Sequence, residues 1–242
     1  MRLSVIVPAY NEGDRIRENL LEISQTLKGN TGDFEILAVN DGSSDNTKEQ
    51  ILKACEEDPD IKYAGYDQNR GKGSAIKHGV EVASGELIGF IDADLDIAPH
   101  HLVTYLKHMD ESGCDIVIGS KMHKESKLDY PPLRRFVSWG YFVILKILFG
   151  MNLKDTQTGI KIYKAGFIKK AAPVLRVKGY AFDIELLALC ARDGAKIEEL
   201  PVEIIYRRDK SFGRIRISDI FRMFFDTIGI WWNLRVRRSY FK

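Results

Sequence analysis

The chain has 242 residues, of which 45% are apolar and 29% charged, the composition of an ordinary soluble globular protein. Its three widely spaced cysteines argue against a disulfide framework or a CxxC metal site, and they favour a reducing, cytosolic setting. The apolar run at 3–7 is short and meets Pro8 at once, and no apolar window of about 18 residues occurs. We therefore expect neither a signal peptide nor a transmembrane helix.

The first half of the chain alternates predicted strands with predicted helices. Apolar runs bounded by turn residues predict strands, and apolar residues at helical spacing predict helices. In chain order we expect strand 3–7, helix 14–27, strand 34–39, helix 47–57, strand 61–64, helix 74–83, strand 87–91, a helix from 99 to about 109, and strand 114–119. This alternation predicts an α/β fold with a mostly parallel sheet and helices on both faces.

The second half is less regular. We expect a helix at 133–150 that is apolar on nearly every side, strand 158–163, helix 182–192, strand 196–206, and a helix whose apolar stripe runs from 217 to 232. No internal repeat or linker is evident. The sequence therefore predicts one domain over 1–214, followed by an amphipathic basic segment over 215–242.

The net charge of +2 is unevenly distributed along the chain. Residues 207–242 carry ten Lys or Arg against three Asp, a net +7, which leaves −5 on the first 206 residues. A basic C-terminal segment on an acidic body favours an anionic partner, such as phosphate groups, nucleic acid or a membrane surface.

Four polar motifs follow four predicted strands, at 8–12, 40–45, 69–73 and 92–96. Ligands of parallel sheets bind at the carboxyl ends of the strands, so this shared placement is stronger evidence than any one motif. The last motif contains three carboxylates directly after an apolar run: Asp92, Asp94 and Asp96. Such carboxylates need a cation, and oxygen ligands suit Mg²⁺ or Mn²⁺. Taken alone, they also fit a solvated acidic turn.

The other motifs have both a nucleotide-binding and a purely structural interpretation. The glycine-rich segment 69–73 lets backbone amides approach a phosphate, but it is neither a Walker loop nor GxGxxG. ATP-hydrolysing and dinucleotide-dependent functions therefore lose support. Segment 40–45 can hold a base or ribose, or it can form an Asx turn in which Asp45 caps the next helix. Tyr10 can stack on a base or simply be half-buried.

In combination, these motifs resemble glycosyltransferase family 2. The order and spacing of Val-Pro-Ala-Tyr-Asn-Glu at 7–12, Asn-Asp-Gly-Ser-Ser-Asp-Asn-Thr at 40–47, Asn-Arg-Gly-Lys-Gly-Ser-Ala at 69–75 and Asp-Ala-Asp at 92–94 are those of that family. Segments 155–163 and 179–187 are similar to its dolichyl- or polyprenyl-phosphate glucosyltransferase and mannosyltransferase branch. The Asp-Thr-Gln at 155–157 resembles the glucosyl members more. The resemblance implies the GT-A fold, and the Gln-x-x-Arg-Trp motif of processive synthases is absent.

The resemblance also implies roles for individual residues. The nucleotide-sugar pocket would be lined by Pro8, Tyr10, Glu12, Asp41, Lys72 and Asp92. Asp94 and, less securely, Asp96 would hold Mg²⁺ or Mn²⁺. The residues expected to act in catalysis or phosphate binding are Asp94, Asp183, Lys121, Arg134 and Arg207, with Arg208 as the alternative to Arg207. By the same resemblance, Lys121 stands at the position where the mannosyl relatives carry an arginine. A lysine does not replace a guanidinium that binds in a bidentate way.

The implied reaction is the inverting, metal-dependent transfer of a hexose from a nucleotide sugar to dolichyl or polyprenyl phosphate. UDP-glucose is the favoured donor and GDP-mannose the next. An anionic phosphate acceptor needs no strong general base, whereas a sugar hydroxyl would need Asp183 or Glu185 as base. Both carboxylates also fit a solvent-exposed helix face, and their spacing points them in different directions.

A lipid acceptor would explain the charge asymmetry. The stripe at 217–232, with its tryptophans and basic flank, fits a helix lying in a membrane interface, and it fits core packing equally well. We expect a peripheral protein at the cytoplasmic face of a membrane. The alternatives are a soluble transferase acting on a sugar hydroxyl, a nucleotidyltransferase, and an anion- or nucleic-acid-binding protein without enzymatic activity. Nucleic acid is not expected as a partner, because the acidic body repels a polyanion.

Overall fold

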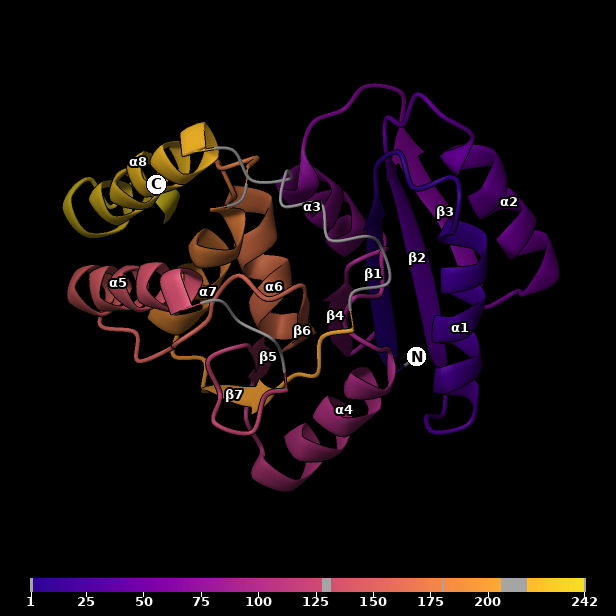
Figure 1. Cartoon of the computed structure of the whole chain (residues 1–242), viewed down its shortest axis with the longest axis horizontal. Coiled ribbons are helices and arrows are strands. Elements are labelled where there is room, and N and C mark those ends of the chain that lie inside the picture. Colours follow the sequence, from indigo (N-terminus) through magenta and orange to yellow (C-terminus); the bar gives the residue numbers. More distant parts are fainter. Residues whose placement is uncertain (1, 128–131, 180, 206–216, 242) are drawn as a thin grey trace.

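The computed structural model describes residues 2–127, 132–179, 181–205 and 217–241, with the backbone alone for 132–139, 217–221 and 241. Figure 1 shows one sheet flanked by helices on both faces. The strands are β1 (Leu3–Ala9), β2 (Phe34–Asp41), β3 (Ile61–Tyr66), β4 (Leu87–Ile91), β5 (Ile116–Ser120), β6 (Ile160–Lys164) and β7 (Ile197–Pro201). The α-helices are α1 (Ile16–Lys28), α2 (Thr47–Glu57), α3 (Lys72–Val82), α4 (His100–Ser112), α5 (Pro132–Phe149), α6 (Ala165–Ala171), α7 (Phe182–Arg192) and α8 (Ile217–Trp231). Two short elements follow α8, a π-helical turn η2 (Trp232–Val236) and a 3₁₀ turn η3 (Ser239–Phe241).

The strand order is β3-β2-β1-β4-β6-β5-β7. The predicted mostly parallel sheet is confirmed, because only β6 runs antiparallel to its neighbours β4 and β5. The chain passes from β1 outward to β2 and β3, and then crosses back through α3 to β4 on the other side of β1. Ligands of open α/β sheets bind at the crevice where the strand order reverses, which here is the carboxyl end of β1 and β4.

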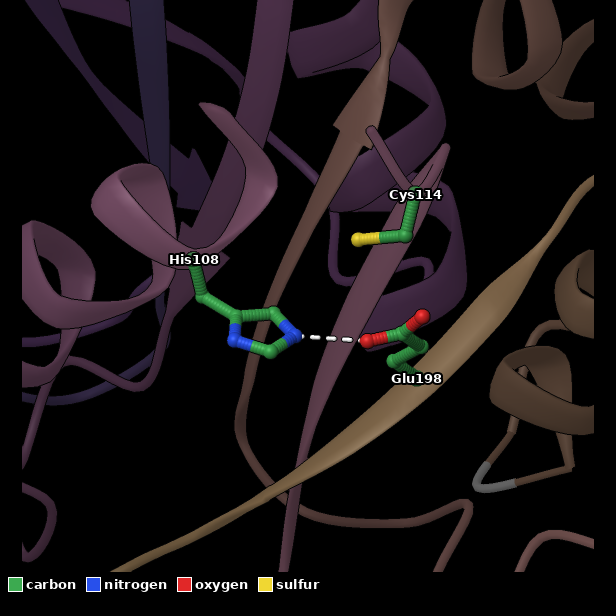
Figure 2. Close-up of side chains that lie close together, drawn as sticks. All are labelled: His108, Cys114 and Glu198. Carbon is green, nitrogen blue, oxygen red and sulfur yellow. Dashed lines mark hydrogen bonds and ion pairs between the residues drawn. The ribbon is translucent and has the colours of Figure 1, made fainter. Parts of the chain in front are cut away.

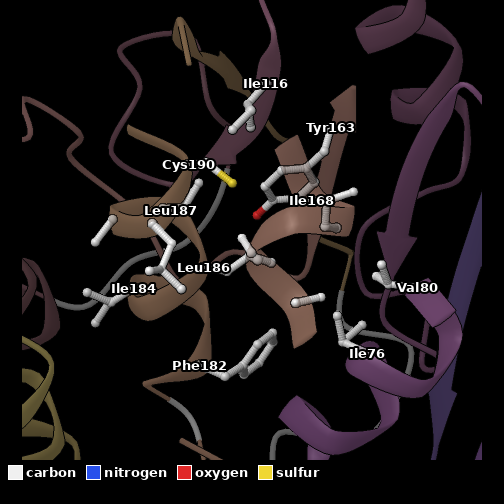
Figure 3. Packing of buried hydrophobic residues seen from close by; sticks show 14 of the residues in the cluster. Ile76, Val80, Ile116, Tyr163, Ile168, Phe182, Ile184, Leu186, Leu187 and Cys190 are labelled. Carbon is white, nitrogen blue, oxygen red and sulfur yellow. The ribbon is translucent and has the colours of Figure 1, made fainter. Parts of the chain in front are cut away.

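Successive side chains of a strand point to opposite faces of the sheet. Both faces are buried here, because helices cover each of them. In β1, Leu3, Val5 and Val7 belong to one apolar cluster and Ile6 to the other. Helices α1 and α4 contribute to the first cluster. The second cluster is formed with α3, α6 and α7, and Figure 3 shows side chains of these helices packed on those of the sheet. Burial on both faces explains why these strands read as continuous apolar runs.

Helix α7 is the most completely buried helix of the described chain. All nine residues 182–190 are at most 4% exposed, and they include Asp183 and Glu185. The interpretation of these two carboxylates as residues of a solvent-exposed helix face is therefore wrong. A helix buried on all sides must supply partners for its own acids, because an unpaired buried charge is costly.

The predicted elements differ from the structure mainly in the second half. Helix α6 has only seven residues, too few to display a helical repeat, and the sequence pattern did not indicate it. The strand expected at 158–163 begins at Ile160, because Asp155 holds the preceding residues in a loop. The strand expected at 196–206 ends at Pro201, and isolated bridges at Glu203 and Ile204 follow it.

The apolar stripe of α8 and the start of η2 is partly buried and partly exposed. Thr227 and Ile230 are buried, whereas Phe224, Phe225, Ile228 and Trp232 are between 37% and 66% exposed. Tyr141 of α5 hydrogen-bonds to Thr227 at 2.8 Å, so α5 and α8 pack side by side, at the left of Figure 1. In the part of the chain that the structure describes, no helix combines the length and apolar character needed to cross a bilayer.

Candidate active site

The first two polar motifs are joined by hydrogen bonds. The Asn11 amide donates to Ser43 Oγ at 3.0 Å, and the Ser44 amide donates to Asn11 Oδ1 at 2.9 Å. Asn11 has a φ of 53°, a left-handed conformation that asparagine tolerates better than most residues. Asp45 accepts from the backbone amides of Thr47 and Gly13, so it joins the start of α2 to the first motif. The expected structural hydrogen bond of Asp45 is present, but the N-cap residue of α2 is Asn46.

Asp41, at the end of β2, shapes the third motif. Its carboxylate accepts from the Tyr66 hydroxyl at 2.6 Å, the Arg70 amide at 2.8 Å and the Gly71 amide at 3.0 Å. The side chain of Asn69 donates to the same carboxylate at 3.1 Å. Because Asp41 is only 4% exposed and already has four donors, its role in this structure is to fix the glycine-rich loop. Direct contact between Asp41 and a nucleoside stays a prediction.

The glycine-rich loop needs its glycines. Gly71 has a φ of 90°, and a Cβ there would lie 2.6 Å from the Lys178 carbonyl oxygen. The Gly73 amide donates to the same oxygen at 3.3 Å, so residue 178 closes this loop from the side of α7. Gly71 is the N-cap of α3, which begins directly after it at Lys72.

Lys72 joins the third motif to the fourth through an ion pair with Asp92. Burial opposes a charge on Lys72, but the carboxylates of Asp92, Asp183 and Asp94 outweigh it and raise the pKa of the lysine. Asp92 is packed from behind, since a Cβ on Gly159 would lie 2.2 Å from Asp92 Oδ2. The four motifs therefore form one continuous network along the carboxyl edge of the sheet, as their positions predicted.

The acidic turn presents its three carboxylates on one side. Ala93, Leu95 and Ile97 are at most 9% exposed and point into the core, whereas the alternating Asp92, Asp94 and Asp96 are half-buried. Leu95 has a φ of 50°, a strained conformation that costs about 1–2 kcal/mol in an L-residue. The Asn19 side chain donates to the Ala93 carbonyl at 2.7 Å and anchors the turn.

This donor set fits a hard divalent cation, because carboxylate oxygens are the ligands that Mg²⁺ and Mn²⁺ prefer. The Asp96 backbone amide donates to Asp94 Oδ1 at 3.3 Å, and Asp92 pairs with Lys72. The assignment of Asp94 and Asp96 as the metal ligands stays a prediction.

A second group of possible metal ligands lies at the opposite edge of the sheet. Figure 2 shows His108, Cys114 and Glu198, whose ligand atoms lie within 4.8 Å of one another. The group is satisfied without a metal, because Glu198 accepts from His108 at 2.6 Å and pairs with Lys196 at 2.8 Å. Burial raises the pKa of the Cys114 thiol and so disfavours the thiolate that a metal needs. We therefore interpret these three residues as structural rather than metal-binding.

Sequence reasoning missed Lys161, which is the partner of Asp183. Lys161 is 0% exposed, and its Nζ donates to Asp183 Oδ1 at 2.7 Å and to the Thr158 carbonyl at 2.6 Å. Burial lowers the pKa of Lys161 and raises the pKa of Asp183. The opposite charge of each partner acts against the other's pKa shift. The sequence did contain a signal for this pair, because Lys161 stands between two isoleucines in a strand that is buried on both faces. A buried lysine needs a buried acid as its partner.

Glu185 faces a different set of partners, as its spacing from Asp183 predicted. It accepts from the amides of Arg176 and Val177 and from the Tyr240 hydroxyl at 2.5 Å. Glu185 therefore ties the loop before α7 to the C-terminal segment. Nothing in this arrangement leaves it available as a base.

The remaining predicted site residues are placed as follows. Pro8 is half-buried at the end of β1, Tyr10 is 48% exposed beside it, and Glu12 is half-buried. Lys121 follows β5, where its amide donates to Asp155 Oδ2 at 2.8 Å and its Nζ lies 3.7 Å from the same oxygen. Arg134 lies on α5, where only the backbone is described, and Arg207 and Arg208 lie outside the described residues.

A mostly parallel α/β sheet with carboxylates and a lysine at its reversal point is consistent with the GT-A fold of glycosyltransferases. Residues 4–172 match the model of the family described as glycosyl transferase family 2, and the chain belongs to this family. The four sequence motifs and their network on one edge of the sheet are the residue-level basis of that membership.

Curated relatives and solved structures agree with this assignment. The chain is 33% identical to dolichyl-phosphate beta-glucosyltransferase of Saccharomyces cerevisiae over 83% of its own length and 66% of the relative's. It is also 33% identical to a dolichyl-phosphate beta-glucosyltransferase of Trichomonas vaginalis over 98% of its own length and 77% of the relative's. The chain thus spans about two thirds to three quarters of these relatives. The fold is similar to glucosyl-3-phosphoglycerate synthase of Mycobacterium tuberculosis in complex with Mn²⁺ and UDP, with a TM-score of 0.69, 18% identity, and coverage of 96% of this chain and 79% of that one.

Proposed function

We propose that this chain transfers glucose, with inversion, from UDP-glucose to dolichyl phosphate or a related polyprenyl phosphate. The observation that carries the proposal is the Lys72–Asp92 pair beside Asp94 at the reversal point of the sheet, in a chain whose relatives are dolichyl-phosphate glucosyltransferases. We place this catalytic unit in residues 1–214, with residues 215–242 as its membrane-facing segment.

The donor would bind across the four-motif network. The exposed ring of Tyr10 is available to stack on the base, and Pro8 and Glu12 would border the nucleoside. Asp41 would act by holding the loop that precedes Lys72. The structural neighbour that holds UDP and Mn²⁺ is consistent with a uridine donor, and GDP-mannose is the second candidate.

Displacement of the nucleoside diphosphate is the step that these residues would assist. An oxygen of the acceptor phosphate attacks the anomeric carbon, and the bond from that carbon to the diphosphate breaks. Mg²⁺ or Mn²⁺ held by Asp94 and Asp96 would supply positive charge at the leaving diphosphate. Lys72, kept protonated by its acidic neighbours, would add a second cation at the same edge.

The acceptor phosphate is anionic near neutral pH and needs no base. The environment of Asp183 supports this type of acceptor. Its carboxylate is 4% exposed and paired with Lys161, an arrangement suited to a structural role, and its burial leaves little room for a sugar hydroxyl to reach it. Lys121, Arg134 and Arg207 remain the proposed contacts of the acceptor or sugar phosphate.

The proposed lipid acceptor agrees with the exposed face of α8. Phe225, Ile228 and Trp232 form an apolar surface, and arginines 235, 237 and 238 follow it. An apolar helix face with a basic flank favours binding in a membrane interface. We propose a peripheral location at the cytoplasmic face of a membrane.

The test is transfer by the purified chain from radiolabelled UDP-glucose, or from GDP-mannose, to a short-chain polyprenyl phosphate. We expect labelled glucose in the lipid fraction, release of UDP, and loss of transfer with a chelator. Asp94→Asn should lower the rate by about a hundredfold or more, since it removes charge stabilisation of the leaving group. Asp67→Asn, an exposed carboxylate after β3, is the matched control and should have little effect. Transfer only to sugar hydroxyls, or release of pyrophosphate, would contradict the proposal.

A further inference from the structure

A cavity of about 340 Å³ lies at the end of the molecule that holds the C-terminus. It is formed by the last turns of α5 and α7, by Met151 two residues beyond the end of α5, and by the turn η2 with Arg238 after it. Its lining residues are Phe149, Met151, Ala188, Ala191, Arg192, Leu234, Arg235 and Arg238. A volume of this size accommodates a small ligand.

The lining combines three arginines with an apolar wall. Arg192, Arg235 and Arg238 are exposed, so an incoming ligand can reach them. Phe149, Met151 and Leu234 are each at most 8% exposed and line the interior side. The eight lining residues include no carboxylate. This combination favours an anion that carries an apolar portion, because guanidinium groups recognise phosphate oxygens bidentately.

The arginines of the C-terminal segment are held in place by a buried anchor. The Tyr240 hydroxyl donates to buried Glu185, and the Arg176 guanidinium lies 4.6 Å from the centre of the Tyr240 ring. Arg176 also donates to the Ser239 carbonyl at 2.7 Å. Arg238 has a φ of 49°, and this left-handed residue turns the chain back toward the anchor. Arg235 donates to the Phe149 carbonyl at 3.3 Å.

The cavity is separate from the candidate active site. Both sites use α7, but Asp183 lies in its first turn, whereas Ala191 and Arg192 lie at its end. Eight residues of helix place the two about 12 Å apart along the axis. The lining residues Leu234 and Arg235 belong to the same turn η2 as the exposed apolar residues Trp232 and Val236, and Trp232 is part of the surface that we assign to the membrane.

We propose that this cavity binds a phosphate ester, presented as the headgroup of an anionic membrane lipid that is distinct from the acceptor substrate. The inference rests on the proposed membrane contact of α8 and adds a defined headgroup site to it. The three arginines bind the phosphate, and the apolar wall contacts the glycerol and the first carbons of the chains.

The test compares two charge-matched double variants in sedimentation with phosphatidylcholine vesicles, with and without an equal part of phosphatidylglycerol. R235Q/R238Q removes two cavity arginines. R222Q/R237Q removes two exposed arginines that do not line the cavity. General attraction to an anionic surface is lost equally by both variants, since each lacks two charges. The proposal expects R235Q/R238Q to weaken binding to the phosphatidylglycerol vesicles about tenfold more than R222Q/R237Q does.

Equal weakening by the two variants, with both still folded by circular dichroism, would overturn the proposal. R235K/R238K keeps the charge and tests the guanidinium geometry, and partial retention of binding supports a bidentate site. Soluble glycerol 3-phosphate is the second arm. If it stabilises the wild-type chain through these arginines while both variants bind vesicles equally, the cavity serves a free phosphate ester and the lipid assignment is wrong. Wild-type transfer to polyprenyl phosphate is measured in the same preparation, so failure of the proposed activity is seen separately.

Discussion

Asp183→Asn tests whether the buried ion pair with Lys161 supports both the fold and the site. The substitution keeps the size of the side chain but removes the negative charge that is paired with the Lys161 ammonium, which is 0% exposed. Its other neighbours include the Thr158 carbonyl and the Phe90 ring, whose centre is 5.1 Å away. Removal of one member of a buried pair typically costs about 3–5 kcal/mol. The cost of burying the unpaired ammonium cannot exceed the cost of removing its proton. For a lysine of ordinary pKa at pH 7, that deprotonation costs about 5 kcal/mol.

Urea unfolding at several pH values measures this cost. Burial already lowers the pKa of Lys161 in the wild type, and loss of the paired carboxylate lowers it further, so the unfolded state of the variant binds more protons than its folded state. Stability of Asp183→Asn should therefore rise as the pH increases from 7 toward 10, and the deficit against wild type should shrink. Asp193→Asn, an exposed carboxylate paired with Lys170 at 3.1 Å, should cost well under about 1 kcal/mol. A deficit below about 1 kcal/mol for Asp183→Asn, or one independent of pH, would refute the reasoning.

Three further predictions concern residues around the same sheet. Gly159→Ala should lower the transfer rate at least about tenfold without unfolding the chain, because its Cβ would displace the Asp92 carboxylate from 2.2 Å away. Burial alone would raise the pKa of Glu35, but hydrogen bonds from Lys62, Ser84 and Ser4 lower it to about 2, so up to about 3 kcal/mol of stability should be lost as the pH falls from 4.5 to 2. Glu35→Gln should remove most of that dependence in acid unfolding followed by circular dichroism. Tyr240→Phe leaves Glu185 with one donor fewer and should destabilise the chain by about 1–3 kcal/mol in thermal or urea unfolding.

Each of these predictions has a result that contradicts it. Gly166→Ala, where a Cβ meets open space, is the control for Gly159, and equal activity of the two variants would remove the packing argument. An unchanged acid transition in Glu35→Gln would show that other carboxylates set it. Unchanged stability in Tyr240→Phe would show that the C-terminal segment is not anchored through Glu185.

The sequence predicted the nucleotide-binding half well because the information there is local. Apolar runs gave β1 to β4 within a few residues, and the polar motifs that follow them lie on one edge, as parallel strands require. The Lys72–Asp92 pair is not visible in the sequence, but its two members were both assigned to one pocket.

The second half depends on pairs that are distant in sequence, so local patterns could not supply them. Lys161 of β6 and Asp183 of α7 are 22 positions apart, and the fold brings them together. The link between Glu185 and Tyr240 joins residues 55 positions apart. Nor could periodicity divide the stripe of α8, since Ile230 and Phe225 have the same apolar character but opposite exposure.

If the proposed lipid site is correct, helix α7 sets how far the reacting phosphate lies from the membrane. Eight residues of this mostly buried helix separate Asp183 from Ala191 at the arginine-lined cavity, so a bilayer held at the cavity would stay at a constant distance from the active site. A rise of about 1.5 Å per residue makes this distance about 12 Å, the length of only a few isoprene units. An acceptor would need to leave the bilayer by that length and no more, so its remaining isoprene units would stay in lipid, and acceptors with longer chains should react at the same rate.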